Sequence, residues 1–111
     1  MIMGKIIIGL PTYVQRYRDL QERPTRWVEI EIPAYAPEYG VWPVSEDDYL
    51  LDVQIEAEEK SVVITADRGG LLSLARHLLT LAQDEVPLGS HIHYDGDMLE
   101  EGSCKLIIGR M

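Results

Sequence analysis

Apolar positions in the first third of the chain follow the two-residue period of β-strands. The run Ile6–Ile8 is β-branched throughout and predicts a strand with both faces at least partly covered. Residues 26–32 (RWVEIEI) alternate strictly and predict a half-buried strand, which Pro33 should end. Its apolar face comprises Val28, Ile30 and Ile32, opposite Trp27, Glu29 and Glu31.

The same alternation returns after residue 48. Residues 49–57 and 62–66 alternate on either side of a polar EEK and predict an antiparallel hairpin. Near the end of the chain, residues 91–95 (HIHYD) and 104–110 (CKLIIGR) indicate two further short strands.

A helical period occurs only once over a long stretch, at about residues 70–83, and Asp67 is the candidate N-cap. The adjacent pair Gly69 and Gly70 lets the chain turn tightly from strand into helix. The apolar stripe should lie on the sheet, with the polar face turned away from it. The stripe consists of Leu71, Leu74, Ala75, Leu78 and Ala82, and the polar face of Ser73, Arg76, His77, Thr80 and Gln83.

Two segments are harder to interpret. Residues 12–23 fit either a short amphipathic helix or an extension of the first strand, and the pattern does not decide between them. Residues 34–45 combine prolines, tyrosines, a glycine and Trp42, so they can form neither a helix nor a central strand.

This order of elements predicts an α+β fold formed by a single domain, residues 1–111. We expect a mostly antiparallel sheet of five to six strands with the one main helix on one face. One helix cannot cover such a sheet, so the other face must meet the N-terminal segment, the aromatic loop or a partner. Six tyrosines and two tryptophans, with no phenylalanine, favour a half-wet interface, and homodimerisation is one form of it.

Charge narrows the choice of partner. Nineteen acidic and ten basic residues give a net charge of −9, which disfavours nucleic acid and anionic membranes and favours a basic protein. An acidic surface that serves only solubility is the alternative. The single cysteine, Cys104, forms no internal disulfide, and neither a signal peptide nor a membrane span is evident, so a cytoplasmic protein is expected.

Few residues of the sequence suggest a catalytic or metal-binding site. His91, His93 and Asp95 alternate along one strand and would share a face, an arrangement that can chelate a divalent metal. Hydrogen-bonded or solvent-facing histidines are the more common explanation of such a pattern. The many carboxylates mark no catalytic pair, and the serines and glycines match no nucleophile or phosphate motif. We therefore expect no cofactor and no enzymatic activity.

Three segments in order, ITADRGGLLSLARHLLTLA, VPLGSHIHYD and LEEGSCKLII, resemble the immunity protein 32 family. The resemblance covers about residues 50–108. It implies a small α+β protein that neutralises a toxin of a bacterial polymorphic-toxin system, and it carries over neither catalytic nor binding residues.

The leading hypothesis is therefore a cytoplasmic, non-enzymatic immunity protein that binds a cognate toxin, expected to be basic, through acidic and aromatic surface. A small metal-binding protein or hydrolase built on His91, His93 and Asp95 is one alternative, and a homodimeric domain of regulatory role is another. The candidate contact residues lie in two groups: Trp42, Glu46, Asp47 and Asp48, and then Asp95, Asp97, Glu100 and Glu101.

Overall fold

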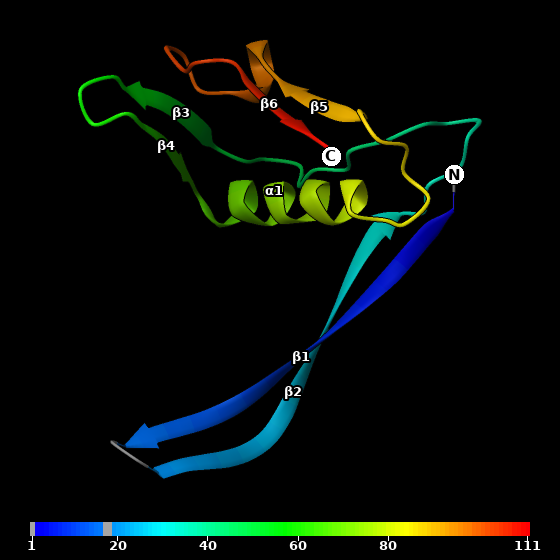
Figure 1. Cartoon of the computed structure of the whole chain (residues 1–111), viewed down its shortest axis with the longest axis vertical. Coiled ribbons are helices and arrows are strands. Elements are labelled where there is room, and N and C mark those ends of the chain that lie inside the picture. Colours follow the sequence, from blue (N-terminus) through cyan, green and yellow to red (C-terminus); the bar gives the residue numbers. More distant parts are fainter. Residues whose placement is uncertain (1, 17–18) are drawn as a thin grey trace.

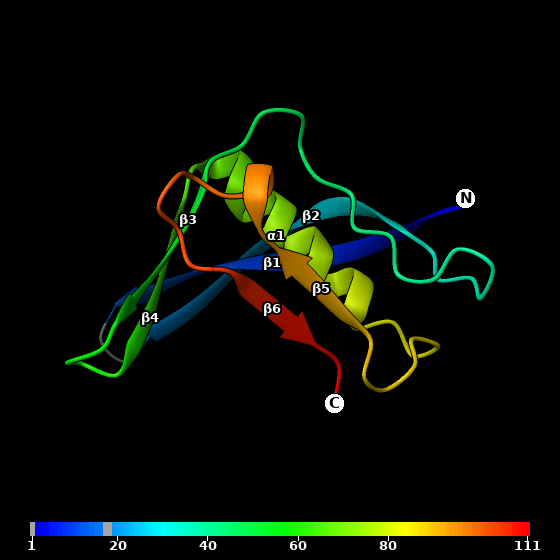
Figure 2. The same cartoon turned by 90° about the horizontal axis from the view of Figure 1, so that it is seen from above.

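A computed structural model describes residues 2–16 and 19–111, with the side chains of residues 11–24 left aside. Its elements are β1 (Met3–Arg16), β2 (Asp19–Pro33), β3 (Leu51–Glu56), β4 (Ser61–Ala66), α1 (Arg68–Leu81), β5 (His91–Tyr94), the 3-10 turn η1 (Gly96–Met98) and β6 (Leu106–Gly109). Figures 1 and 2 show the strand pairs arranged around α1. The α+β class is confirmed. The single sheet of five to six strands is wrong, because the strands form three separate antiparallel pairs, β1–β2, β3–β4 and β5–β6.

Strands β1 and β2 form a long two-stranded arm that projects away from the rest of the molecule (Figure 1). The backbone of residues 12–16 and 19–23 is extended, so this part of the segment is strand and not helix. Residues 17–18 and the side chains of the segment lie outside the description. One face of the arm is apolar, because Ile6 lies opposite Ile30 and Ile8 opposite Val28. On the other face Ile7 is 60% exposed, so this face is covered only in small part.

The predicted strand at residues 26–32 is confirmed and ends at Pro33 as expected. Val28 and Ile30 are half-buried and Ile32 is buried, whereas Trp27, Glu29 and Glu31 are exposed.

The β3–β4 hairpin is confirmed, and irregular backbone occupies the other edge of β3. The Glu100 N–H donates to the Leu51 carbonyl at 2.8 Å, and the Cys104 N–H donates to the Val53 carbonyl at 2.7 Å. The Ser103 hydroxyl donates to Asp52 at 2.8 Å. These bonds fix the segment that leads into β6 beside β3 without extending the strand ladder, which is one reason why a continuous sheet does not form.

A small core lies between α1, β3 and the β5–β6 pair. Its buried members are Leu51, Leu81, Val86, Ile92 and Tyr94. Half-buried side chains around it come from the loops as well as from the strands.

The predicted N-cap of α1 is confirmed, since the Asp67 carboxylate accepts the Gly70 N–H at 2.7 Å. The predicted orientation of the helix is wrong. Besides Gly70 and Leu81, the buried residues of α1 are the polar Ser73, His77 and Thr80, each at most 2% exposed, whereas Leu71 is 55% and Leu78 46% exposed.

The reversal has a local cause: polar groups of the preceding loop meet the polar face of α1. The Glu46 N–H donates to Ser73 Oγ at 2.8 Å, and Ser45 Oγ lies 3.0 Å from His77 Nε2. The Thr80 hydroxyl donates to the Arg76 carbonyl. Each buried polar group thereby finds a partner, so its burial carries little penalty.

Residues 34–50 wrap along α1. As expected, residues 34–45 form neither a helix nor a regular strand, apart from one isolated bridge between Ala36 and Gly40. Tyr49 and Leu50, which the alternation assigned to the next strand, lie before its observed start at Leu51. Gln83 anchors the start of this loop, because its side chain accepts the Tyr35 N–H and donates to the Pro33 carbonyl. Within the described residues, no helix has both the length and the apolarity that crossing a membrane requires.

Candidate partner-binding site

An acidic hollow of about 290 Å³ opens at the N-terminal end of α1. Four carboxylates line it, Asp47, Asp48, Asp67 and Asp97, together with Tyr49 and Leu50. They come from three places in the sequence: the loop before β3, the cap of α1 and the turn η1. The structure therefore brings together members of both sequence-predicted acidic groups.

Asp67 is held in place by two backbone donors. Its Oδ1 accepts the Leu50 N–H at 3.0 Å and the Gly70 N–H at 2.7 Å. These bonds, the one from Leu50 first, lower the pKa of the Asp67 carboxyl from its ordinary value of 3.8. The carboxylate is therefore charged at neutral pH and fixed at the wall of the hollow. Sequence reasoning assigned Asp67 only a capping role, since nothing in the pattern placed it beside Asp97.

A second hollow of about 270 Å³ also borders η1, through Gly96, and is lined by Asp95, Glu100, Glu101 and Lys105, among others. Lys105 Nζ lies 3.6 Å from the Asp95 carboxylate, and both side chains are more than half exposed, so this ion pair stabilises the fold little. Glu100 and Glu101 are exposed. Both hollows border η1 and are lined by carboxylates, and the two together are hereafter called the acidic surface.

Two candidate contact residues fit this surface less well. Glu46 already pairs with Arg76, whose Nη2 lies 3.2 Å from the Glu46 carboxylate. Trp42 is 53% exposed but lines neither acidic hollow. The expected contact role of these two residues stays a prediction.

His91 and His93 emerge on one face of β5, as predicted, and their ring centroids lie 4.8 Å apart. His91 Nδ1 lies 3.0 Å from the Gly89 carbonyl, and Asp95 pairs with Lys105. Among residues 2–16 and 19–111 no group of three histidine, cysteine or carboxylate side chains is placed to hold a metal ion. The metal alternative therefore gains no third ligand from the described residues.

A buried chain of hydrogen bonds crosses the core from Ser45 through His77 to Tyr94. His77 Nε2 lies 3.0 Å from Ser45 Oγ, and His77 Nδ1 lies 2.8 Å from the Tyr94 hydroxyl. Removal from water lowers the pKa of His77, opposed by the Val44 backbone, and raises the pKa of Tyr94, with a further contribution from Tyr49. A serine beside a histidine is a nucleophile–base arrangement, but His77 and Tyr94 are each 1% exposed. The chain of bonds holds loop, helix and β5 together, and its central ring, His77, is shielded from solvent by burial.

The fold therefore defines a small α+β protein whose most distinctive surface is acidic. Residues 61–111, from β4 to the C-terminal end, match the family model of immunity protein 32. This match confirms the sequence resemblance over that segment. No curated protein and no solved structure shows significant similarity to the chain.

Proposed function

We propose that this chain is a non-enzymatic immunity protein that acts in the bacterial cytoplasm, where it binds a cognate toxin and neutralises it. The observation that carries the proposal is the match of residues 61–111 to immunity protein 32. That segment supplies Asp67, Asp97 and the whole of the second hollow. The part of the chain that resembles the family therefore also contributes most of the acidic surface.

The acidic surface favours a basic docking face on the toxin. Carboxylates around η1 attract lysine and arginine side chains and accelerate encounter, while acidic proteins are repelled. A toxin that acts on an anionic substrate such as nucleic acid presents a basic active-site face. Covering that face with the acidic surface would block access of the substrate and needs no chemistry from the immunity protein.

Asp47, Asp48 and Asp97 are the best contact candidates within this surface. All three are exposed, and none of them makes a salt bridge within the described residues. Asp67 is excluded from the test because its two backbone bonds support the fold.

The experiment uses the toxin encoded beside this gene and measures growth rescue and binding affinity with the purified pair. The triple variant Asp47→Asn, Asp48→Asn, Asp97→Asn should bind more weakly and protect less, with unchanged circular dichroism. The matched control is Glu56→Gln, Glu58→Gln, Glu59→Gln, which removes the same charge from the exposed end of the β3–β4 hairpin.

Failure of the wild-type protein to bind or neutralise this toxin would contradict the proposed function. Equal losses in both triple variants would contradict only the assignment of the surface, because they would show a general effect of net charge.

A further inference from the structure

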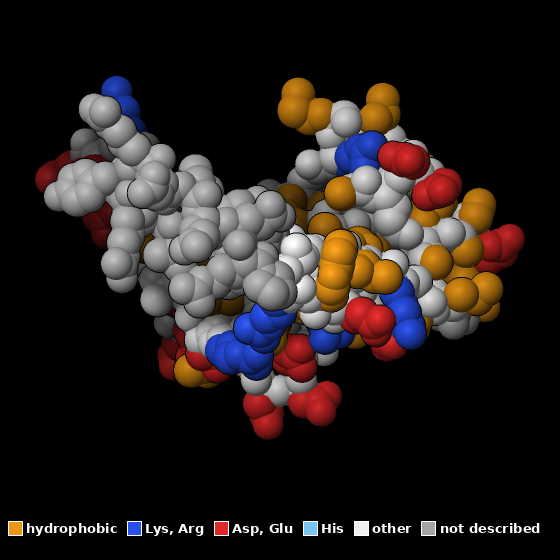
Figure 3. Space-filling model, turned by 90° about the horizontal axis from the view of Figure 1, so that it is seen from below, with side chains coloured by type: hydrophobic (Ala, Val, Ile, Leu, Met, Phe, Trp, Pro, Cys, Tyr) orange, Lys and Arg blue, Asp and Glu red, His pale blue; other side chains and the backbone are white. Residues whose placement is uncertain are grey.

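A row of open apolar side chains lies on α1, on the side away from the core. Leu71, Ala75, Leu78 and Ala82 follow one another at helical spacing, and the half-buried Leu72 and Leu79 flank them; we call this set the open stripe. In Figure 3 hydrophobic side chains reach the surface on the underside of the molecule, next to the arm.

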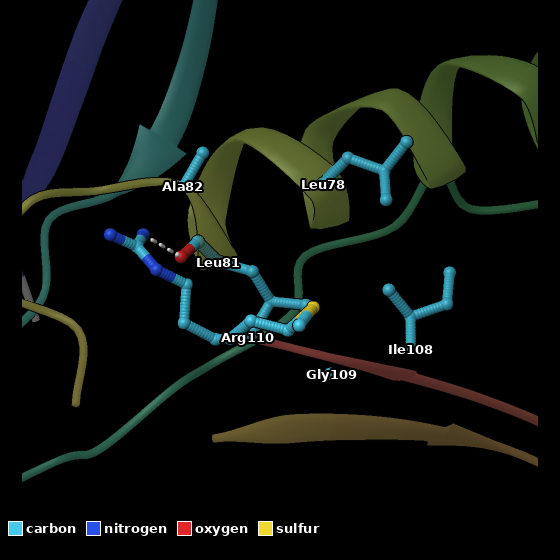
Figure 4. A pocket seen from close by; sticks show the side chains of 7 residues that line it. Leu78, Leu81, Ala82, Ile108, Gly109 and Arg110 are labelled. Atoms are coloured by element: carbon cyan, nitrogen blue, oxygen red, sulfur yellow. Dashed lines mark hydrogen bonds between the residues drawn. The ribbon is translucent and has the colours of Figure 1, made fainter. Parts of the chain in front are cut away.

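The open stripe ends in a hollow of about 420 Å³ between α1 and β6 (Figure 4). Its walls include Leu78, Leu81, Ala82 and Ile108. Arg110 Nη1 donates to the carbonyls of Leu81 and Gln83, at 2.8 and 3.1 Å. The Arg110 guanidinium group is hydrogen-bonded to the end of α1. The rest of the wall is mainly aliphatic and suits an apolar side chain.

The chain as a whole exposes far more surface than a monomer of its size should. Its accessible surface is 8484 Å² for 12.6 kDa, whereas a folded monomer of that mass exposes roughly 6,200 Å². The radius of gyration is 17.1 Å, against about 13 Å for a compact chain of this length. The projecting β1–β2 arm contributes to this excess of about 2,300 Å² (Figure 1), so the open stripe and the arm together offer the area that each copy loses in a permanent homodimer, about 1,000–2,500 Å².

The distribution of charged residues indicates which partner covers the open stripe. The chain carries nineteen acidic residues, yet α1 contains none, and its only full charges are Arg68 and Arg76. Two chains of net charge −9 repel each other over most of their surfaces, and α1 is a surface on which they can meet without opposing carboxylates. A basic partner, by contrast, gains no attraction from a stripe that lacks carboxylates.

From the open stripe, the excess surface and the absence of acid on α1, we infer that a second copy of this chain covers the stripe. The two helices meet antiparallel about a two-fold axis near Ala75, whose small side chain permits close approach. Leu71 of each copy then packs beside Leu78 of the other, at the mouth of the aliphatic hollow.

The arm extends the same interface. Its apolar face, which includes Ile6, Ile8, Val28 and Ile30, also carries Ile32, which is buried where β2 contacts α1. The face therefore continues from the covered base of the arm into the open part, and the second copy lies between the arm and the helix.

The test measures the mass of the purified chain by light scattering and by sedimentation equilibrium at micromolar concentration, with no toxin present. We expect twice 12.6 kDa for the wild type. The double variant Leu71→Glu, Leu78→Glu and the single variant Leu78→Lys should have the mass of one chain. The control Leu88→Glu, at a 76% exposed position off the stripe, should keep the dimer. Circular dichroism and melting curves check that each variant folds.

A wild type with the mass of one chain overturns the inference, and so does a folded Leu71→Glu, Leu78→Glu variant that stays dimeric. A monomeric wild type whose stripe variants lose toxin binding would assign the stripe to the toxin instead. Because the masses are measured without toxin, this result is independent of whether the chain is an immunity protein.

Discussion

His77 shows how a single residue couples the core to pH. Its ring is 1% exposed and joins Ser45 to Tyr94, and burial lowers its pKa below the ordinary value of 6.5. The unfolded chain therefore binds the proton more readily than the folded one. The stabilising contribution of the neutral ring is complete above the unfolded value and is lost as pH falls below it.

We expect the free energy of unfolding to decrease between about pH 7.5 and 5.5, above the range in which ordinary carboxyl groups titrate. Urea denaturation of the wild type and of His77→Gln at both pH values measures it. The variant should be less stable at the higher pH and should change less with pH. Identical pH dependence in the two proteins would exclude His77 as the source.

Gly70 permits the close approach of strand and helix. A Cβ at this position would collide with the Leu50 carbonyl oxygen and would lie 2.8 Å from the Ala66 Cβ. We expect Gly70→Ala to destabilise the protein by about 1–3 kcal/mol, the range typical of an overpacked site. The control is Gly4→Ala, whose nearest new contact is 3.7 Å. Thermal melting compares the stabilities of the two variants, and equal melting temperatures would be inconsistent with this close packing at Gly70.

At the scale of elements, the contact between the 34–50 loop and α1 determines which face of the helix is buried. The Glu46 N–H donates its hydrogen bond to Ser73 Oγ, and Ser73 is 2% exposed. Removing that hydroxyl leaves a partly buried donor unpaired, which costs about 1–3 kcal/mol. Gains in helix propensity recover only a few tenths of this.

Ser73→Ala should therefore lower the urea midpoint. Ser61→Ala is the matched control, because the Ser61 hydroxyl is buried and has no hydrogen-bond partner in the described part of the chain, so its removal should be neutral or slightly stabilising. A Ser73→Ala protein as stable as Ser61→Ala would mean that the loop does not hold α1 by this bond.

At the scale of the whole molecule, charge and open apolar surface are separated. Carboxylates gather around η1 and the start of α1, whereas the open stripe carries none. The separation lets a toxin and a second copy occupy different surfaces. The proposed homodimer would then leave the acidic surface of each copy free.

The association rate with the toxin should fall steeply as salt rises, because the Debye length shrinks from about 30 Å at 0.01 M to about 8 Å at 0.15 M. The triple variant at Asp47, Asp48 and Asp97 should lose part of this dependence, while its dissociation rate changes less. Surface plasmon resonance at several salt concentrations measures both rates. A salt slope equal to that of the wild type would remove these three residues from the encounter surface.

The sequence by itself determined the secondary structure well. Alternation placed the strands at residues 26–32, the β3–β4 hairpin and His91–Tyr94, and Asp67 marked the start of the helix. These features depend on neighbouring residues, which is why local pattern reveals them. The total charge and the resemblance over residues 61–111 were likewise available from the sequence.

Only the tertiary structure decided how these elements pair and which faces they bury. Periodicity distinguishes an apolar from a polar helix face, but whether a polar face can be buried depends on partners distant in sequence, here Ser45, Glu46 and Tyr94. The meeting of Asp47 and Asp48 with Asp97 has the same cause, since about fifty intervening residues must fold before these carboxylates share one hollow. The acidic surface and the open stripe are therefore properties of long-range contacts, which no local pattern encodes.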